Sequence, residues 1–216
     1  EFDLGLAFDG DADRMIMVAP NGEQITGDHV LYVTGKYYRD LGVLANNTVV
    51  TTVMANLGLF KALEREGIHA EQTQVGDKYV YEKMCADGDI VGGEQSGHII
   101  FSEHERTGDG LVTALIFLKI MKELNKTALQ LCEGLKIYPQ LLVNVKVSDK
   151  KKAMGDEDVK AAIDEVNQTL HGNGRLTARN DPDNEAARIF CGVVADCQKA
   201  PADSDVVGRR HGRAVC

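Results

Sequence analysis

The 216-residue sequence has no excess of positive charge. It contains 24 Lys and Arg against 33 Asp and Glu, which gives a formal net charge of −9. A nucleic acid-binding domain concentrates basic residues along one face, and no such basic stripe occurs here, so nucleic acid is not an expected partner. The same acidity would repel a phosphorylated sugar at long range, and any anion site must therefore be built locally.

Paired cysteines and long apolar runs are also missing. The five cysteines form no Cys-x-x-Cys pair and have no metal-ligand spacing with His, so we expect free thiols in a reducing, cytoplasmic environment. The longest apolar stretch, residues 111–120, is interrupted by Thr113 and Lys119 and predicts a buried helix rather than a membrane span. The sequence has no signal peptide and begins without Met inside an apolar run, which predicts a fragment of a longer protein.

Three aspartates at alternate positions, Asp9, Asp11 and Asp13, stand between two apolar runs, residues 4–8 and 15–19. Short apolar runs around an Asp/Gly turn predict a strand, a tight acidic turn and a second strand. Three carboxylates at this spacing repel one another unless a cation lies among them, and their hard oxygen atoms favour Mg²⁺ or Ca²⁺. The sequence therefore predicts a metal site.

Two other interpretations of this acidic turn are weaker. A solvated turn without a metal is common for Asp and Gly, but both flanking runs look buried, and buried unpaired carboxylates are costly. A helix-loop-helix Ca²⁺ site would need Gly and Glu where Arg14 and Pro20 occur. Arg14, directly after the last aspartate, suggests that a phosphate also approaches.

Beyond the acidic turn, short apolar strand patterns alternate with helical patterns. We expect strands at residues 48–54, 68–75 and 89–93 and helices at 29–41, 57–66, 76–86 and 111–124. The last helix follows Thr107-Gly108-Asp109-Gly110, in which Asp109 is expected to cap the free N–H groups. This alternation predicts an α/β fold with a mixed, mostly parallel sheet flanked by helices. After a short helix at 128–135, a smaller α+β carboxy-terminal domain is expected from a strand at 140–147, a solvated lysine-rich linker at 150–152, a helix at 156–170 and a strand at 175–178. The expected domains are 1–21, the end of a domain with the acidic turn; 22–136, the α/β domain; and 137–216, a partial α+β domain with an atypical tail.

A second polar segment, residues 92–98, follows the last strand of the expected sheet. Small residues there surround Glu94, Ser96 and His98. A carboxylate accepts protons from two hydroxyl groups and a serine can donate or accept, so the segment is suited to binding sugar hydroxyls. A polar β-turn without a ligand is the alternative. Ser96 is not in a Gly-x-Ser-x-Gly elbow, so it is not expected to be a hydrolase nucleophile.

Both segments resemble those of one enzyme family. Asp-Gly-Asp-Ala-Asp-Arg at residues 9–14 resembles the metal-binding loop of the α-D-phosphohexomutases, and Gly-Glu-Gln-Ser-Gly-His at 93–98 resembles their sugar-binding loop. This family moves a phosphoryl group between the 6- and 1-positions of a hexose phosphate through a phosphoserine. The resemblance implies a fold like the third domain of these enzymes, and it leaves open a homodimer of the intact enzyme.

The resemblance also implies roles for eight residues: Asp9, Asp11 and Asp13 as Mg²⁺ ligands, Arg14 and His98 in catalysis by binding phosphoryl and assisting proton transfer, and Glu94, Ser96 and Lys78 in binding the substrate. A helix cap is an equally weighted interpretation of the segment around Lys78. Gln95 is typical of the branch that acts on glucosamine phosphates, whereas branches acting on mannose or glucose phosphates commonly have Met there. A hexosamine phosphate is therefore the expected substrate.

The resemblance covers residues 1–179 and then stops. The family's phosphate-clamp loop, Arg-x-Ser-Gly-Thr-Glu-Pro, does not follow Arg179, and a shifted reading frame is one hypothesis for this difference. The phosphoserine would precede Glu1, so this chain alone is expected to be inactive. Two other functions stay open: a phosphosugar-binding module without chemistry, and a phosphatase with Asp9 as the nucleophile. The segment at 93–98 argues against the phosphatase.

Overall fold

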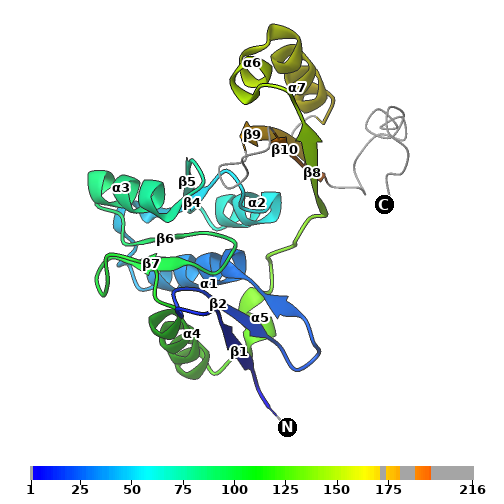
Figure 1. Ribbon diagram of the computed structural model, residues 1–216. Coiled ribbons are helices and arrows are strands. Elements are labelled where there is room, and N and C mark those ends of the chain that lie inside the picture. The colour runs from blue at the N-terminus through cyan, green and yellow to red at the C-terminus, as the bar shows by residue number, and fades with distance from the viewer. Residues whose placement is uncertain (1, 171–173, 181–187, 196–216) are drawn as a thin grey trace. The chain divides into compact units, whose positions relative to one another are not determined.

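The structure is a computed structural model that describes residues 2–170, 174–180 and 188–195 (Figure 1). The chain divides into two compact units, Glu1–Ile137 and Tyr138–Cys216, called here the first and second unit. Among the described residues, no helix is both long enough and apolar enough to cross a membrane.

The first unit contains most of the expected elements. In chain order they are β1 (Gly5–Phe8), β2 (Met15–Val18), β3 (Gln24–Ile25), α1 (Gly27–Asp40), the 3₁₀ turn η1 (Ala45–Asn47), β4 (Thr48–Thr52), α2 (Leu57–Arg65), β5 (His69–Thr73), α3 (Asp77–Asp87), β6 (Val91–Gly93), β7 (Ile99–Phe101), α4 (Gly110–Leu124) and α5 (Ala128–Cys132). The helix expected at 128–135 is shorter than predicted, because Glu133 leaves the helical conformation and Gly134 follows with a φ of +99°.

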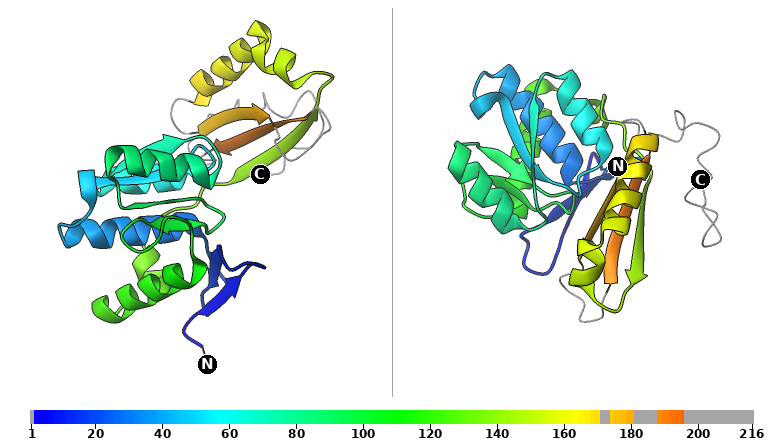
Figure 2. Two further views of the ribbon diagram at one scale, coloured as in Figure 1. Left: turned by 60° about the vertical axis from the view of Figure 1, so that its left-hand side comes forward. Right: turned by 90° about the horizontal axis from the view of Figure 1, so that it is seen from above.

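The main sheet has the strand order β5-β4-β6-β7. Strand β4 is parallel to β5 and to β6, and β7 is antiparallel to β6. The prediction of a mixed, mostly parallel sheet is therefore confirmed. Helix α3 covers one face of the sheet, and α1 lies on the other face with α2 beside it (Figures 1 and 2).

The two faces of the sheet contribute to different apolar clusters because side chains alternate along a strand. Val49 belongs to the large core that α1, α2 and α4 share, whereas the adjacent Val50 packs with Val80 and Met84 of α3. All three of these valines are fully buried. A β-branched strand that is buried on both faces is typical of a sheet between two helical layers.

Helix α4 packs on the far side of α1 and matches the helix predicted for residues 111–124. It begins as the sequence indicated: the Asp109 side chain caps it by accepting the Val112 backbone N–H at 2.9 Å. Phe117 and Ile120 are buried beneath it. The prediction of a helix is confirmed, but only one of its faces is buried, since Leu111 and Leu115 are each 58% exposed.

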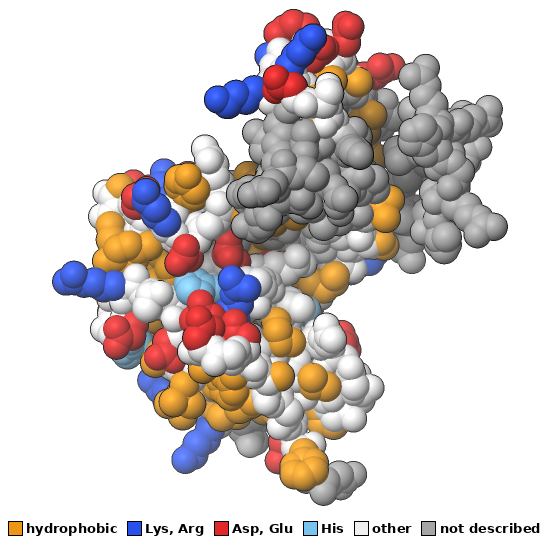
Figure 3. Space-filling view, in the orientation of Figure 1, with side chains coloured by type: hydrophobic (Ala, Val, Ile, Leu, Met, Phe, Trp, Pro, Cys, Tyr) orange, Lys and Arg blue, Asp and Glu red, His pale blue; other side chains and the backbone are white. Residues whose placement is uncertain are grey.

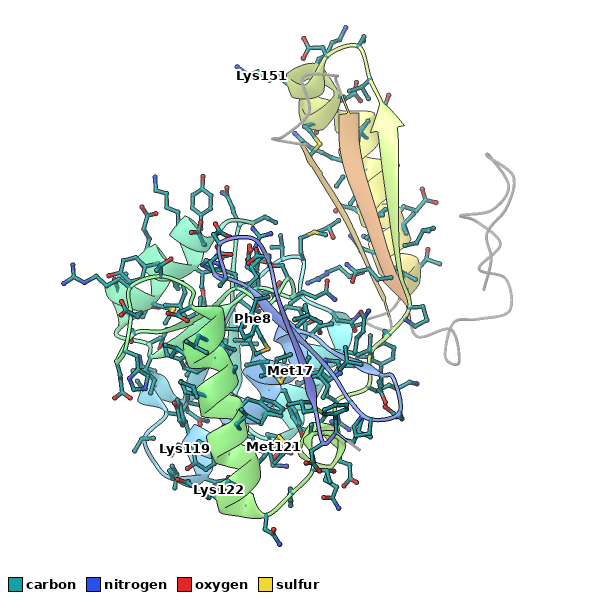
Figure 4. The ribbon with its side chains drawn as sticks, turned by 60° about the horizontal axis from the view of Figure 1, so that its bottom comes forward. Phe8, Met17, Lys119, Met121, Lys122 and Lys151 are labelled. Atoms are coloured by element: carbon teal, nitrogen blue, oxygen red, sulfur yellow. The ribbon has the colours of Figure 1, made fainter. Side chains whose placement is uncertain are left out.

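Strands β1, β2 and β3 form a separate antiparallel sheet in the same unit, with β2 in the middle. Met15 and Met17 of β2 are fully buried, and β2 packs against α4 (Figure 4). Strand β1 lies at the edge, where Leu6 is 39% and Phe8 is 41% exposed. The expectation that both runs beside the acidic turn are buried is thus wrong for the first run, since an edge strand has a neighbour on one side only.

The second unit contains one strand, β10, that was not predicted. Strand β10 (Arg188–Ala195) lies antiparallel between β8 (Gln140–Lys146) and β9 (Gly174–Asn180). Helices α6 (Lys150–Gly155) and α7 (Glu157–Leu170) complete the described part. The lysine run at 150–152 is therefore the start of a helix and not a linker, because Asp149 caps it by accepting the Lys152 N–H at 3.0 Å. The rest of the predicted atypical tail lies outside the described residues.

Candidate functional site

The acidic turn between β1 and β2 brings three carboxylates together. Asp9, Asp11 and Asp13 each offer an oxygen atom, and these atoms lie within 4.8 Å of one another. The turn closes through the Ala12 N–H, which donates to the Asp9 carbonyl at 3.3 Å, and Ala12 has a φ of +60°. A non-glycine residue in the left-handed region marks a backbone that its surroundings hold in place.

The two oxygens of Asp13 have different environments. Oδ2 lies 3.0 Å from His98 Nδ1, whereas Oδ1 is buried without a hydrogen-bond partner. A buried carboxylate oxygen without a partner is costly, and a cation among the three aspartates would satisfy it. The donor set consists of carboxylates alone, as Mg²⁺ and Ca²⁺ prefer. The residues present therefore fit a hard divalent cation. Only Asp13 is partly buried, because Asp9 and Asp11 are exposed. The burial that was expected for this turn is therefore confined to Asp13.

Arg14 lies beside this carboxylate group without forming a close ion pair. Its Nε is 4.0 Å from Asp9 Oδ2 and 3.9 Å from Asp13 Oδ1, and its side chain is 52% exposed. Both distances exceed hydrogen-bonding range. The guanidinium group therefore keeps its donors available for an anion that approaches the aspartates.

His98 is the most enclosed residue of the site, with 4% of its surface exposed. Besides Asp13, it meets the Gly108 backbone N–H, which donates to Nε2 at 3.0 Å. An oxygen of Asp77 lies 3.9 Å from the same nitrogen. A Cβ atom at position 108 would lie 2.5 Å from this ring, so only glycine permits the approach. The acidic turn, the 94–98 loop and the segment before α4 therefore meet at His98.

Glu94 links the predicted sugar-binding loop to the start of α3. Its Oε1 accepts the Gly76 backbone N–H at 3.0 Å, and Ser96 Oγ lies 3.5 Å from its other oxygen, Oε2. Ser96 is exposed, and Glu94 is half-buried. One carboxylate oxygen thus fixes the loop, while the other lies beside the hydroxyl of the exposed Ser96.

Main-chain hydrogen bonds fix the shape of this loop. The Gly27 N–H at the start of α1 donates to the Gln95 carbonyl at 3.1 Å, and the Met15 N–H donates to the Gly97 carbonyl at 3.2 Å. A Cβ atom on Gly27 would lie 1.9 Å from the Glu94 carbonyl oxygen. The loop therefore lies directly against the beginning of α1 and against β2.

Within the described part of the chain, the side chain of Lys78 contacts none of the other predicted site residues. Its side chain is 72% exposed, and its Nζ lies 3.7 Å from Glu82 on the same helix, α3. Its contact with a sugar phosphate stays a prediction, as does proton transfer by His98. Gly108 and Asp77 were not predicted to contact His98. Two glycines on either side of Asp109, Gly108 and Gly110, were the sequence signal that the backbone approaches another group closely before α4.

These groups share one face of the first unit. Figure 3 shows acidic side chains gathered beside a histidine and a basic side chain on that face. The arrangement offers carboxylates for a cation, a guanidinium group for an anion, and a carboxylate–hydroxyl pair for sugar hydroxyls. Together these groups have the chemistry to bind a phosphorylated sugar with a divalent cation.

Sequence comparison gives matches along most of this chain. A family profile described as phosphoglucomutase/phosphomannomutase, alpha/beta/alpha domain III, matches residues 26–138. The phosphoglucosamine mutase of Lachnospira eligens is 49% identical over 199 residues, which are 91% of this chain and 44% of that protein. The phosphoglucosamine mutase of Geobacillus kaustophilus is 51% identical over 213 residues, which are 97% of this chain and 47% of that protein. The chain thus spans less than half the length of these relatives.

Solved structures share the fold at lower sequence identity. An N-acetylglucosamine-phosphate mutase in its substrate complex superposes with a TM-score of 0.73 and 21% identity, covering 95% of this chain and 48% of that one. The N-acetylphosphoglucosamine mutase of Aspergillus fumigatus, in complex with GlcNAc-6P and magnesium, gives a TM-score of 0.71 and 19% identity, covering 88% of this chain and 48% of that one. At these identities the structures support the fold alone.

Proposed function

Because this chain belongs to the phosphoglucomutase/phosphomannomutase family, also called the α-D-phosphohexomutases, we propose that it is part of a phosphoglucosamine mutase. The longer protein would interconvert glucosamine 6-phosphate and glucosamine 1-phosphate, with a phosphoserine carried by a part that this chain does not contain. The observation that carries the proposal is the identity of about half the residues to two phosphoglucosamine mutases over nearly the whole chain.

Asp9, Asp11 and Asp13 are the proposed ligands of a magnesium ion. The ion would neutralise charge on the phosphoryl group as it transfers. The convergence of the three carboxylates and the unpartnered Oδ1 of Asp13 support this assignment. Arg14 would bind the same phosphoryl group, because its guanidinium group is close to the aspartates and not engaged by either neighbour at hydrogen-bonding distance.

Glu94 and Ser96 are the proposed sugar-binding residues. Glu94 Oε1 is held by the Gly76 N–H, so Oε2 and the Ser96 hydroxyl would accept from and donate to the hydroxyl groups of the hexose. Lys78 would reach the phosphate at the other end of the sugar, since its exposed side chain is held only by a 3.7 Å pair with Glu82. Such a pair contributes little and gives way to a phosphate.

A titration of the 216-residue chain with sugar phosphates tests the binding residues. In ¹H–¹⁵N spectra recorded with Mg²⁺, we expect glucosamine 6-phosphate to shift the amide signals of Ser96 and Gly97 at lower concentration than mannose 6-phosphate does. Glu94→Gln should weaken this binding at least tenfold, because it removes the charge that strengthens hydrogen bonds to hydroxyl groups. Glu103→Gln, an exposed glutamate after β7, is the matched control. If Glu94→Gln and Glu103→Gln bind glucosamine 6-phosphate with the same affinity, Glu94 is not a sugar-binding residue.

Turnover needs a phosphoserine, so the chain alone should not interconvert the two phosphates. We therefore propose a chimera in which residues 1–137 replace the aligned segment of the Geobacillus kaustophilus enzyme. The chimera should convert glucosamine 6-phosphate to glucosamine 1-phosphate, and the same chimera with Asp11→Asn should not. A folded chimera without mutase activity, or activity in the 216-residue chain by itself, would refute the proposal.

A further inference from the structure

We propose that His98 is a positioning residue of the metal site: an imidazole whose Nδ1–H holds Asp13 Oδ2 and leaves Oδ1 for a cation. The inference rests on the metal site of the proposed function. It assigns His98 a different role from the proton transfer that the sequence resemblance implied. Hydrogen bonds on both ring nitrogens carry the argument.

The partner of Nε2 decides where the imidazole proton lies. A backbone N–H can only donate, and the Gly108 N–H lies 3.0 Å from Nε2, so this nitrogen must be the acceptor. The Asp77 oxygen lies 3.9 Å away, beyond hydrogen-bonding range, and does not compete. Nε2 therefore has no proton in this arrangement, and the N–H of the ring is at Nδ1.

The Nδ1 proton points at a metal ligand. Nδ1 lies 3.0 Å from Asp13 Oδ2, which accepts this proton as a hydrogen bond. The contact fixes the carboxylate about its last torsion angle and leaves Oδ1, which is buried without a partner, as the free coordinating oxygen. Groups that hold a ligand in this way are known to set metal affinity, typically by a factor of ten to a hundred.

The imidazole has little freedom to adopt another arrangement. Its residue is 4% exposed, and the backbone of Gly108 lies against the ring so closely that a Cβ atom there would be 2.5 Å from it. On the other side, the His98 carbonyl accepts the Glu94 N–H at 2.9 Å and so anchors the residue within the loop. A ring held this firmly orients Asp13 before the cation arrives. With Nε2 covered by Gly108, neither nitrogen is open to a substrate hydroxyl.

The tautomer can be measured on the unaltered chain. In ¹⁵N spectra that correlate ring nitrogens with ring protons, His98 should have a pyrrole-type Nδ1 and a pyridine-type Nε2 near neutral pH. This is the reverse of the arrangement that free neutral histidine prefers. A pyrrole-type Nε2 on His98, or exchange between both tautomers, would overturn the inference without any mutation.

The effect on metal binding is tested with Mn²⁺ as the probe, counted as free ion by electron paramagnetic resonance. His98→Asn keeps a nitrogen donor at the position of Nδ1, whereas His98→Gln moves the amide to the position of Nε2 and loses the donor to Asp13. We expect His98→Gln to weaken Mn²⁺ binding about tenfold and His98→Asn to stay within about twofold of the original chain. His104→Gln changes an exposed histidine of the same unit and is the matched control.

The outcomes separate this inference from the proposed function. If the unaltered chain does not bind Mn²⁺, the metal site itself is wrong. If it binds Mn²⁺ and both His98 variants bind equally well, or both lose binding equally, the metal site stands and the positioning role is refuted. Circular dichroism spectra identify any variant that fails to fold, and the tautomer measurement then decides.

Discussion

Glu66 provides the sharpest test of how the first unit is held together. It ends α2 and accepts hydrogen bonds from three side chains of α1: Tyr32 at 3.2 Å, Lys36 at 2.9 Å and Arg39 at 2.9 Å. The Lys36 ammonium, with help from Arg39, lowers the pKa of Glu66 from 4.5 to about 2. We expect Glu66→Gln to loosen the junction of these two helices, because it removes the charge that both cations share.

The magnitude follows from the pKa of Glu66. A change from 4.5 to about 2 corresponds to about 3 kcal/mol in favour of the charged, folded form. Because the Lys36 side chain is 39% exposed and solvent weakens such pairs, we discount this value to about 1.5 kcal/mol. Glu66→Gln should therefore lower the free energy of unfolding by about 1.5 kcal/mol at pH 7. Glu64→Gln, an exposed glutamate on the same helix, should change it by less than about 0.5 kcal/mol.

The effect of Glu66 should also depend on pH with a defined sign. Its folded pKa lies below its unfolded value, so its stabilisation is fully present above pH 4.5 and is lost as the pH falls toward about 2. Urea unfolding followed by circular dichroism at pH 7 and pH 3 measures both the size and the sign. The reasoning is refuted if Glu66→Gln loses as much free energy of unfolding at pH 3 as at pH 7. It is also refuted if Glu64→Gln loses as much as Glu66→Gln.

Two further predictions concern the packing of the first unit. Gly97 has a φ of +94°, and a Cβ atom there would lie 2.3 Å from the Met15 carbonyl oxygen. Gly97→Ala should therefore lower the free energy of unfolding by about 2–3 kcal/mol in the same urea experiment. A variant as stable as the original chain would contradict this. Burial raises the pKa of the Cys132 thiol to about 12, whereas Cys85 is exposed. In the native chain at pH 8, Cys85→Ala should remove one thiol that reacts with a disulfide reagent, and Cys132→Ala should remove none. If Cys132→Ala also lowers the number of reactive thiols, Cys132 is not buried.

Much of the first unit could be predicted because its sequence patterns are local. The β-branched residues of β4 and the apolar spacing of α4 each indicate one kind of element, and Asp109 was identified as a helix cap. The exposure of β1 could not be predicted in this way. An apolar run shows that a strand forms, but the number of its neighbours in a sheet depends on the rest of the fold.

The second unit shows where the same patterns were misread. The lysine run was interpreted as a linker because of its charge, although Asp149 before it is a common helix cap. Strand β10 was missed although Ile189, Phe190 and Cys191 are consecutive apolar residues. These residues were interpreted only as part of an atypical tail, because the segment as a whole is rich in Asp, Arg and Gly.

The residues of the candidate site could be predicted, but not the contacts among them. Asp13 and His98 are 85 positions apart, and each was recognised from its own short motif. That they hydrogen-bond follows from the position of the 94–98 loop against β2. Gly108 matters because its backbone lies against the ring of His98. The sequence does not show this distance.

The way in which the 94–98 loop is held has an evolutionary consequence. Main-chain groups fix its shape, through the Gly27 N–H to the Gln95 carbonyl and the Met15 N–H to the Gly97 carbonyl. Neither bond depends on the side chain at position 95. Different side chains can therefore occupy position 95 while the fold of the loop and the neighbouring carboxylates stay in place. Evolution can vary this position by single substitutions without passing through unfolded intermediates.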